Sequence, residues 1–220
     1  MRQVNIALDG PSGAGKSSVA KECAKQLGLI YIDTGAMYRA AALYAIENGI
    51  PIERDALLPH LDGIHIDIRH VEGSQHIFLN GRDVSERIRE ADASIGSSNI
   101  AVIPEVRAKL VELQRELARN NSVVMDGRDI GTNVLPDADL KIFLTASLDV
   151  RAKRRYRELQ EKGMGRAYEA VKQDMAYRDE NDSKRECAPL CMAEDAVLID
   201  SSDMTFEEVV RKIAGMISKL

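Results

Sequence analysis

The first third of the chain passes from an alternating pattern of side chains to a helical one, and then repeats the change. Residues 3–8 alternate between polar and apolar side chains, which predicts a short strand. Apolar residues then recur every three or four positions over 19–27, as on one face of a helix. A second apolar strand is predicted at 29–32, and a second helix at 34–48 with Thr34 as its cap. This order predicts an α/β fold with a parallel sheet.

A different pattern covers residues 62–89. The segments 64–68 and 76–79 have strand-like sequences, and the pairs Glu-Gly at 72–73 and Asn-Gly at 80–81 are turn signals. Two strands joined by a short turn do not fit the strand–helix alternation of a parallel sheet. We therefore predict a small antiparallel insertion here.

Strands and helices alternate again in the second half of the chain. Thr205 and Glu208 have the spacing of a capping box, which predicts the start of a terminal helix. Before it, the apolar pattern predicts strands at 122–125, 140–144 and 196–199 and helices at 104–119, 148–162 and 171–185.

Composition narrows the class of protein. A chain of 220 residues that is 45% hydrophobic can form one domain without disulfides or structural metals. No segment approaches the ~20 consecutive apolar residues of a membrane span, and no apolar signal-peptide core follows Met1. Three cysteines are an odd number and imply no disulfide framework. We therefore expect a cytoplasmic protein, working as a monomer without a membrane partner.

The net charge of −5 disfavours a general nucleic-acid-binding protein, because such proteins carry a basic surface. One segment is nevertheless strongly basic: five cations fall within residues 151–157. They either form an ordinary solvated helix surface or face a bound polyphosphate that relieves their mutual repulsion. We favour the second interpretation, in which residues 148–166 form a lid and Arg154 and Arg155 contact ATP.

A glycine-rich loop joins the first predicted strand to the first predicted helix. Residues 10–17 read Gly-x-x-x-x-Gly-Lys-Ser, which is the P-loop pattern in its expected context. The glycines let backbone N–H groups turn toward phosphate oxygens, and the helix N-terminus adds positive potential. Lys16 would reach the β- and γ-phosphates, and the Ser17 hydroxyl would ligate Mg²⁺. The predicted ATP site comprises Gly10, Pro11, Ser12, Gly13, Ala14, Gly15, Lys16, Ser17 and Ser18.

Asp126 follows a short apolar strand at 122–125. A carboxylate in this position could hold Mg²⁺ directly or through water. An ordinary aspartate in a strand-to-loop turn has the same sequence signature, so the sequence leaves both interpretations open.

The P-loop alone does not distinguish switches, motors, kinases and proteins that only bind nucleotide. The chain contains no guanine-reading Asn-Lys-x-Asp segment and is short for a motor. Its many arginines suit a kinase with a small anionic acceptor, because guanidinium groups match phosphate oxygens bidentately. A kinase for another small acceptor (UMP, AMP or shikimate) and a protein that binds ATP without phosphoryl transfer are the alternatives.

Four separated motifs resemble those of the bacterial cytidylate kinase family over essentially the whole chain. They are the P-loop at 10–17, Asp-Thr-Gly-Ala-Met-Tyr-Arg at 33–39, Asp-Gly-Arg-Asp-Ile-Gly-Thr at 126–132, and the charged residues of 178–185 ahead of Ala-Pro-Leu at 188–190. The insertion at 62–89 also resembles the extra antiparallel segment of that family. The resemblance implies one nucleoside monophosphate kinase domain over 1–220, with the insertion in the acceptor-binding region.

The resemblance also implies an activity: transfer of the γ-phosphoryl group from ATP, with Mg²⁺, to CMP or dCMP. Lys16, Arg128 and Arg185 would be the catalytic residues. Some members carry Ser at the position of Thr34. Other members carry Gly or Thr at the position of Ser17. The implied CMP site comprises Arg39, Arg128 and Arg185 around the phosphate, Ser98, Arg107 and Asp129 at the cytosine edge, Arg178 and Asp182 near the sugar hydroxyls, and Thr34.

Two of these assignments also follow from chemistry. Asp129 can accept a hydrogen bond from the N4 amino group of cytosine and would repel the O4 of uracil. Arg178 and Arg185 are seven residues apart, which predicts a shared helix face. Asp182 lies between them and would orient both guanidinium groups. A solvated ladder of salt bridges is the alternative interpretation of this trio.

Overall fold

The computed structural model describes residues 3–71, 74–161 and 163–220, and it separates into two compact units. Unit 1 comprises residues 1–31 and 120–220, and unit 2 comprises residues 32–119. No helix among the described residues is long and apolar enough to cross a membrane. That residues 1–220 act as one kinase domain stays a prediction.

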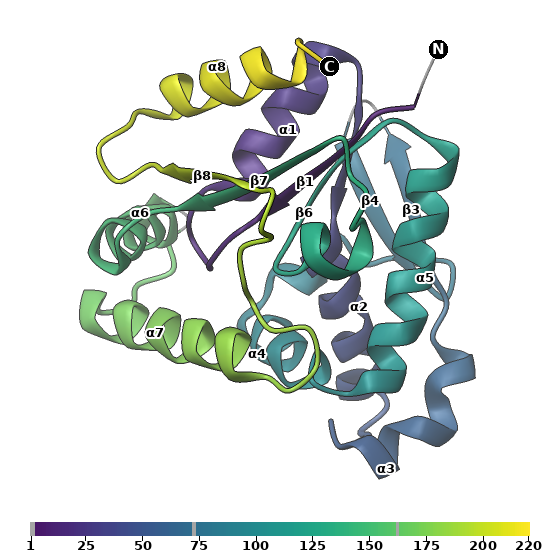
Figure 1. Cartoon of the computed structure of the whole chain (residues 1–220). Coiled ribbons are helices and arrows are strands. Elements are labelled where there is room, and N and C mark those ends of the chain that lie inside the picture. Colours follow the sequence, from purple (N-terminus) through teal and green to yellow (C-terminus); the bar gives the residue numbers. More distant parts are fainter. Residues whose placement is uncertain (1–2, 72–73, 162) are drawn as a thin grey trace. The chain divides into compact units, whose positions relative to one another are not determined.

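A parallel sheet forms the centre of unit 1, as predicted (Figure 1). In register, Asn5 of β1 (Asn5–Asp9) lies opposite Val123 of β6 (Val123–Gly127), and Ile6 of β1 lies opposite Leu140 of β7 (Leu140–Thr145). Most apolar side chains of these three strands are almost fully buried, which explains their largely hydrophobic sequences. The strand order is β2 (Ile30–Asp33), β6 (Val123–Gly127), β1 (Asn5–Asp9), β7 (Leu140–Thr145) and β8 (Val197–Asp200).

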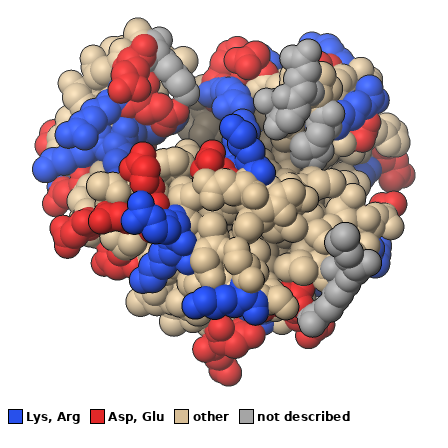
Figure 2. Space-filling model, turned by 90° about the horizontal axis from the view of Figure 1, so that it is seen from above, with Lys and Arg blue, Asp and Glu red and all other residues tan. Residues whose placement is uncertain are grey.

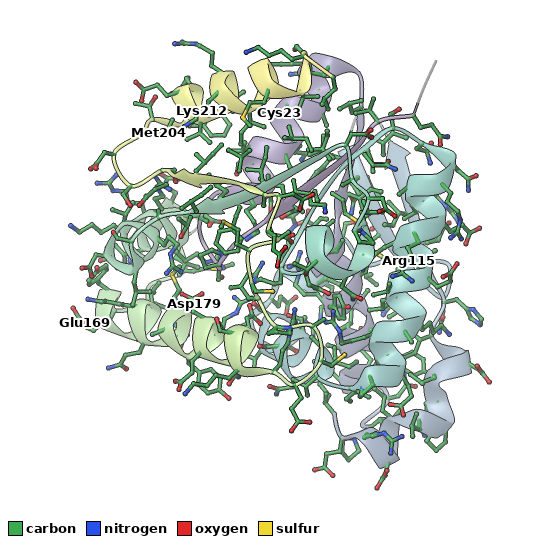
Figure 3. The ribbon with its side chains drawn as sticks, viewed as in Figure 1. Cys23, Arg115, Glu169, Asp179, Met204 and Lys212 are labelled. Atoms are coloured by element: carbon green, nitrogen blue, oxygen red, sulfur yellow. The ribbon has the colours of Figure 1, made fainter. Side chains whose placement is uncertain are left out.

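Helices cover this sheet. In Figure 1, α1 (Lys16–Leu27) and α8 (Phe206–Ile217) lie together on one face. Cys23 of α1 is buried where α1 packs on α8 (Figure 3), with its Sγ 3.9 Å from the carbonyl oxygen of Val210. The helices α6 (Leu148–Glu161) and α7 (Tyr168–Lys184) pack on each other through a small apolar cluster. A short π-helical turn, η3 (Ile130–Val134), follows β6.

Unit 2 combines helices with the predicted antiparallel insertion. Asn80 and Gly81 have φ angles of 50° and 80°, the left-handed conformations of a tight hairpin turn. The three strands of the insertion are β3 (Ile66–Val71), β4 (Ser74–Leu79) and β5 (Arg82–Asp83). The other predicted turn, at residues 72–73, lies outside the described residues. The remaining elements are α2 (Thr34–Glu47), α3 (Arg54–Leu57), η1 (Leu58–Gly63), η2 (Arg87–Arg89), α4 (Ala91–Ile100) and α5 (Pro104–Asn120).

One helix cap differs from the prediction. Asp33, not Thr34, caps α2: its Oδ1 accepts a hydrogen bond of 2.9 Å from the backbone N–H of Ala36. Thr34 is instead the first residue of the helix and is buried. Both residue types are good caps, so the sequence places the start of the helix only to within one residue.

Candidate active site

The phosphate loop joins β1 to α1 and depends on its glycines. Gly10 has a φ of 145°, and a Cβ atom there would lie 2.0 Å from the carbonyl oxygen of Leu144. Gly13 and Gly15 are left-handed, with φ angles of 73° and 91°. Gly15 is the N-cap of α1, so the loop ends where the helix N-terminus exposes its N–H groups. The predicted P-loop geometry is confirmed.

Lys16 is enclosed by this loop. Its side chain is buried, and its Nζ donates a hydrogen bond of 2.8 Å to the carbonyl oxygen of Pro11. The pKa of Lys16 is lowered to about 7, chiefly by burial and then by the positive charge of Arg128, while nearby carboxylates act in the opposite direction. A polyphosphate would supply the counter-charge that this buried amine needs, so the loop is suited to a strong anion.

Ser17, Asp126 and Tyr31 form a hydrogen-bonded group beside the loop. The Ser17 hydroxyl donates to Oδ2 of Asp126 at 2.8 Å, and the Tyr31 hydroxyl donates to Oδ1 at 3.0 Å. Carboxylate and hydroxyl oxygens are ligands that suit Mg²⁺. The two oxygens expected from the sequence thus lie together, and this donor set fits the cation.

Two arginines of unit 1 are held by two buried aspartates. Arg128 Nε donates to Oδ2 of Asp182 at 2.7 Å, and Arg185 Nη2 donates to Oδ1 of Asp129 at 3.2 Å. Burial opposes the charge of Arg128, but the charge and hydrogen bond of Asp182 prevail and raise the pKa of the guanidinium. Burial would raise the pKa of Asp182, but the positive charge of Arg128 and its hydrogen bond lower it. Arg128 and Asp182 therefore form a fixed ion pair, and a guanidinium group held in this way is suited to binding an anion.

This arrangement corrects one sequence prediction. Arg185 lies beyond the end of α7 in an extended conformation, so it does not continue the helical face of Arg178. Asp182 makes its hydrogen bond to Arg128, 54 positions away in the chain. The charges of Arg185 and Arg178 still contribute to the low pKa of Asp182. The helical spacing predicted the cluster but the wrong partner for its central carboxylate.

Asp9 belongs to this region and was not predicted from the sequence. It is 5% exposed, and its two carboxylate oxygens accept hydrogen bonds from the backbone N–H groups of Ile130 and Gly131 at 2.8 and 2.7 Å. Burial raises the pKa of Asp9 to about 6, although the two backbone hydrogen bonds oppose the shift. An aspartate at the end of a buried strand, the signal that indicated Asp126, could have found it.

Unit 2 contains the other predicted CMP-binding residues. Arg39 forms an ion pair of 2.9 Å with Asp33, whose backbone N–H donates to the side-chain oxygen of Gln75 in β4. Arg107 is buried in α5, with its guanidinium 5.6 Å from the ring centroid of Tyr38. Their companions are Thr34, which is buried, and Ser98, which is half-buried in α4.

Two arginines of the basic helix α6 have protein partners that the sequence did not indicate. Arg154 donates to the hydroxyl and carbonyl oxygens of Ser201 at 3.1 and 2.7 Å, and Arg155 pairs with Glu158 at 2.7 Å. Over the face of the molecule shown in Figure 2, acidic side chains lie among the basic ones. The lid function of residues 148–166 and the contact of Arg154 and Arg155 with ATP stay predictions.

Comparison with known proteins decides the family. A sequence model described as cytidylate kinase matches residues 6–219. The chain belongs to the cytidylate kinase family. It is 51% identical to a cytidylate kinase of Caldicellulosiruptor saccharolyticus, with 100% of this chain and 98% of that one covered. It is 48% identical to a cytidylate kinase of Oceanobacillus iheyensis, with 99% and 95% covered.

The family resemblance seen in the sequence is thus confirmed, and with it the prediction of an ATP-dependent nucleoside monophosphate kinase. Among solved structures, an uncharacterized protein from Eubacterium ventriosum has a TM-score of 0.54 at 15% identity, with 100% of each chain covered. That likeness concerns the fold alone. The roles of individual residues in this cytidylate kinase family member rest on the geometry above and are proposals.

Proposed function

We propose that the chain transfers the γ-phosphoryl group of ATP to CMP or dCMP, as a cytidylate kinase does. The observation that carries this proposal is the cluster of Arg128, Arg185, Asp129 and Asp182 in the unit that contains the phosphate loop. Two oriented guanidinium groups, one close enough to Lys16 to lower its pKa, form a second anion site. A protein that only bound ATP would not need this second site.

The reaction requires positioned charge rather than a base. A phosphate oxygen of CMP is already an anion near neutral pH, so it can attack the γ-phosphorus without losing a proton to the protein. Lys16 would neutralise the donor phosphates, and Arg128 and Arg185 would hold the acceptor phosphate and the charge of the transition state. Holding both reactants in line supplies much of the remaining acceleration.

Ser17 and Asp126 would hold Mg²⁺, with Tyr31 orienting the carboxylate. When bound, the cation neutralises charge on the phosphates of ATP. The loop residues Gly10 to Ser18 would surround those phosphates. Arg154 and Arg155 would contact ATP only after leaving Ser201 and Glu158, their present partners.

Recognition of the acceptor is assigned residue by residue. Asp129 would accept from the cytosine amino group, because its carboxylate is buried and fixed. The remaining roles follow the family motif: Arg39 at the phosphate, Ser98 and Arg107 at the base, and Arg178 and Asp182 at the sugar. Thr34 is assigned to the CMP site as well.

The deciding experiment measures ADP release from ATP and Mg²⁺ with CMP, dCMP, UMP, AMP or no acceptor. We expect CMP and dCMP to accelerate ADP release far above the rate without acceptor. Lys16→Ala should lower this rate by about two to three orders of magnitude, the usual cost of one lost transition-state partner. A preference for UMP or AMP would indicate a kinase for another acceptor, and ADP release independent of any acceptor would refute the proposed transfer.

We place the reaction in the cytoplasm. All three cysteines, Cys23, Cys187 and Cys191, are free thiols, as is usual in a reducing compartment. We propose that the chain acts there as a monomer, which sedimentation at working concentration would test.

A further inference from the structure

The peptide groups on both sides of Ser12, near the apex of the phosphate loop, are held by side chains from α6 and α7. Arg151 Nη1 donates to the carbonyl oxygen of Ser12 at 2.9 Å, and Oδ1 of Asp179 accepts from the N–H of Ser12 at 3.3 Å. The same guanidinium and carboxylate form an ion pair of 2.6 Å. Figure 3 shows Asp179 on the side of α7 that faces α6. The contacts close a ring around one residue of the loop.

Arg151 is fixed in this ring and does not point into solvent. Its side chain is 8% exposed, and its Nε donates to the carbonyl oxygen of Ala146, just after β7, at 2.8 Å. Unlike the other cations of the basic helix, it is therefore bonded to the loop, to the end of a strand and to the neighbouring helix. Gly13 lies close by, since a Cβ atom there would come within 2.4 Å of Cε of Met175.

Because peptide groups are planar, these two contacts also fix the direction of the N–H and C=O groups on the other side of each peptide. In a trans peptide the C=O and N–H groups point in opposite directions. Arg151 holds the C=O of the Ser12–Gly13 peptide, so the Gly13 N–H must point the other way. Asp179 holds the N–H of the Pro11–Ser12 peptide, so the C=O of Pro11 points the other way, where it accepts from Lys16 Nζ at 2.8 Å.

Without such contacts the loop could rearrange. Gly13 has a φ of 73° and no side chain, so the peptide before it rotates with little steric resistance. A half-turn of the Ser12–Gly13 peptide would exchange an N–H donor for a carbonyl oxygen, which repels phosphate. The positions of both α6 and α7 therefore influence whether an N–H donor or a carbonyl oxygen of the loop faces the phosphate.

We propose that Arg151 and Asp179 are positioning residues of the phosphate loop, which act on ATP through the two peptides flanking Ser12 and not by touching the nucleotide. This inference deepens the proposed function, because it assumes that the loop binds the phosphates of ATP. It does not depend on which acceptor the enzyme uses.

The test measures ATP affinity by calorimetry in the absence of acceptor, for Arg151→Met, Asp179→Ala and the double variant. Each single variant should weaken ATP binding by about tenfold to a hundredfold, since each removes a charge-assisted contact on the loop. The double variant should be no weaker than the worse single variant, because both act through the same ring. The Michaelis constant for CMP should change less than twofold in all three.

A direct contact between Arg151 and ATP gives a different result. Asp179→Ala would then release the guanidinium for the nucleotide, so ATP affinity would stay the same or rise, which would overturn the proposal. Arg151→Lys and Asp179→Asn keep size and should retain part of the affinity. They also test the proposal if the larger changes prevent folding.

Lys172→Met is the matched control. Lys172 in α7 pairs with Asp149 in α6 at 2.5 Å, so this exposed ion pair links the same two helices. If the ring acts through Ser12, Lys172→Met should leave ATP affinity within twofold of the unmodified protein. An equal loss of affinity in this control would show that packing of α6 on α7 is all that matters, and the proposal would be wrong. Failure of CMP turnover with intact ATP binding would instead count against the proposed function.

Discussion

At the scale of single residues, Arg128 and Arg185 differ in their partners although both are assigned to the acceptor phosphate. Arg128 is bonded to Asp182 and Arg185 to Asp129. Arg128→Ala and Arg185→Ala should each raise the Michaelis constant for CMP or lower turnover by about a hundredfold or more, while ATP affinity changes little. Steady-state kinetics beside ATP calorimetry will measure this. Equal damage to both ligands would place these arginines on the donor side.

The choice of base is assigned to Asp129. Asp129→Asn supplies an amide that can turn its N–H toward the O4 of uracil, which removes the repulsion of UMP. One base-edge contact contributes about 1–3 kcal/mol of discrimination, so the ratio of kcat/KM for CMP over UMP should fall by about tenfold to a hundredfold. Because the carboxylate also pairs with Arg185, the change could instead disturb the phosphate site. That effect would lower both activities in proportion, and an unchanged ratio would remove Asp129 from base reading.

The sequence predicted those residues of the site whose spacing is fixed by local structure. Lys16 and Ser17 follow from the loop pattern, and Asp126 from its place at a strand end. Asp9 and Arg151 were not assigned their roles, because their partners are distant in the chain: Asp9 bonds Ile130, 121 positions away, and Arg151 bonds Ser12, 139 positions away. Only the fold brings such groups together.

At the scale of elements, the capping box of α8 is confirmed atom by atom. Thr205 Oγ1 accepts from the N–H of Glu208 at 3.2 Å, and Oε2 of Glu208 accepts from the N–H of Thr205 at 2.8 Å. Thr205→Ala should destabilise the protein by about 1 kcal/mol, which lowers Tm by about 2–4 °C for a chain of this size. Calorimetric unfolding will measure it. Thr205→Ser keeps the hydroxyl and should unfold near the original temperature, and equal losses in both variants would contradict the capping role.

Elements with a strong apolar period were predicted well, and those without one were missed. The sequence of α4, Ala-Asp-Ala-Ser-Ile-Gly-Ser-Ser-Asn-Ile, is small and polar and carries little helical pattern. It forms by close packing on α2: a Cβ atom at Gly96 would lie 3.0 Å from the Cβ of Ala42. Such a helix depends on a tertiary contact that the local sequence pattern does not indicate. The two-residue strand β5 was missed because it is too short to alternate.

At the scale of the whole molecule, the division into two units was not predicted. Its boundaries fall after residues 31 and 119, within β2 and near the end of α5. Domain boundaries are usually recognised by glycine- or proline-rich linkers, and regular elements cross these two. Composition and periodicity therefore indicate one continuous α/β pattern and give no sign of the two boundaries.

The stability of the whole molecule should depend on pH through Asp9. The buried carboxyl is faced by the backbone N–H groups of Ile130 and Gly131 and by the charges of Asp129 and Lys16. Its pKa is about 6 in the folded protein, raised chiefly by burial from 3.8. Between these two values the folded state binds more protons than the unfolded state, so this group makes the free energy of unfolding fall as the pH rises.

The contribution of Asp9 should fall by about 2 kcal/mol between pH 4 and pH 6.5, because most of the shift of about two pKa units, at 1.36 kcal/mol each, acts in that range. Other groups act in the opposite direction at lower pH: the pKa of Asp92, for example, is held at about 2 by its hydrogen bonds with Arg87. The comparison is therefore between the unmodified chain and Asp9→Asn, by urea unfolding at each pH. The variant loses part of the contact with Ile130 and Gly131 at every pH but carries no titrating group. The difference in stability between the two proteins should shrink as the pH rises from 4 to 6.5, and a constant difference would show that Asp9 keeps an ordinary pKa in the folded state.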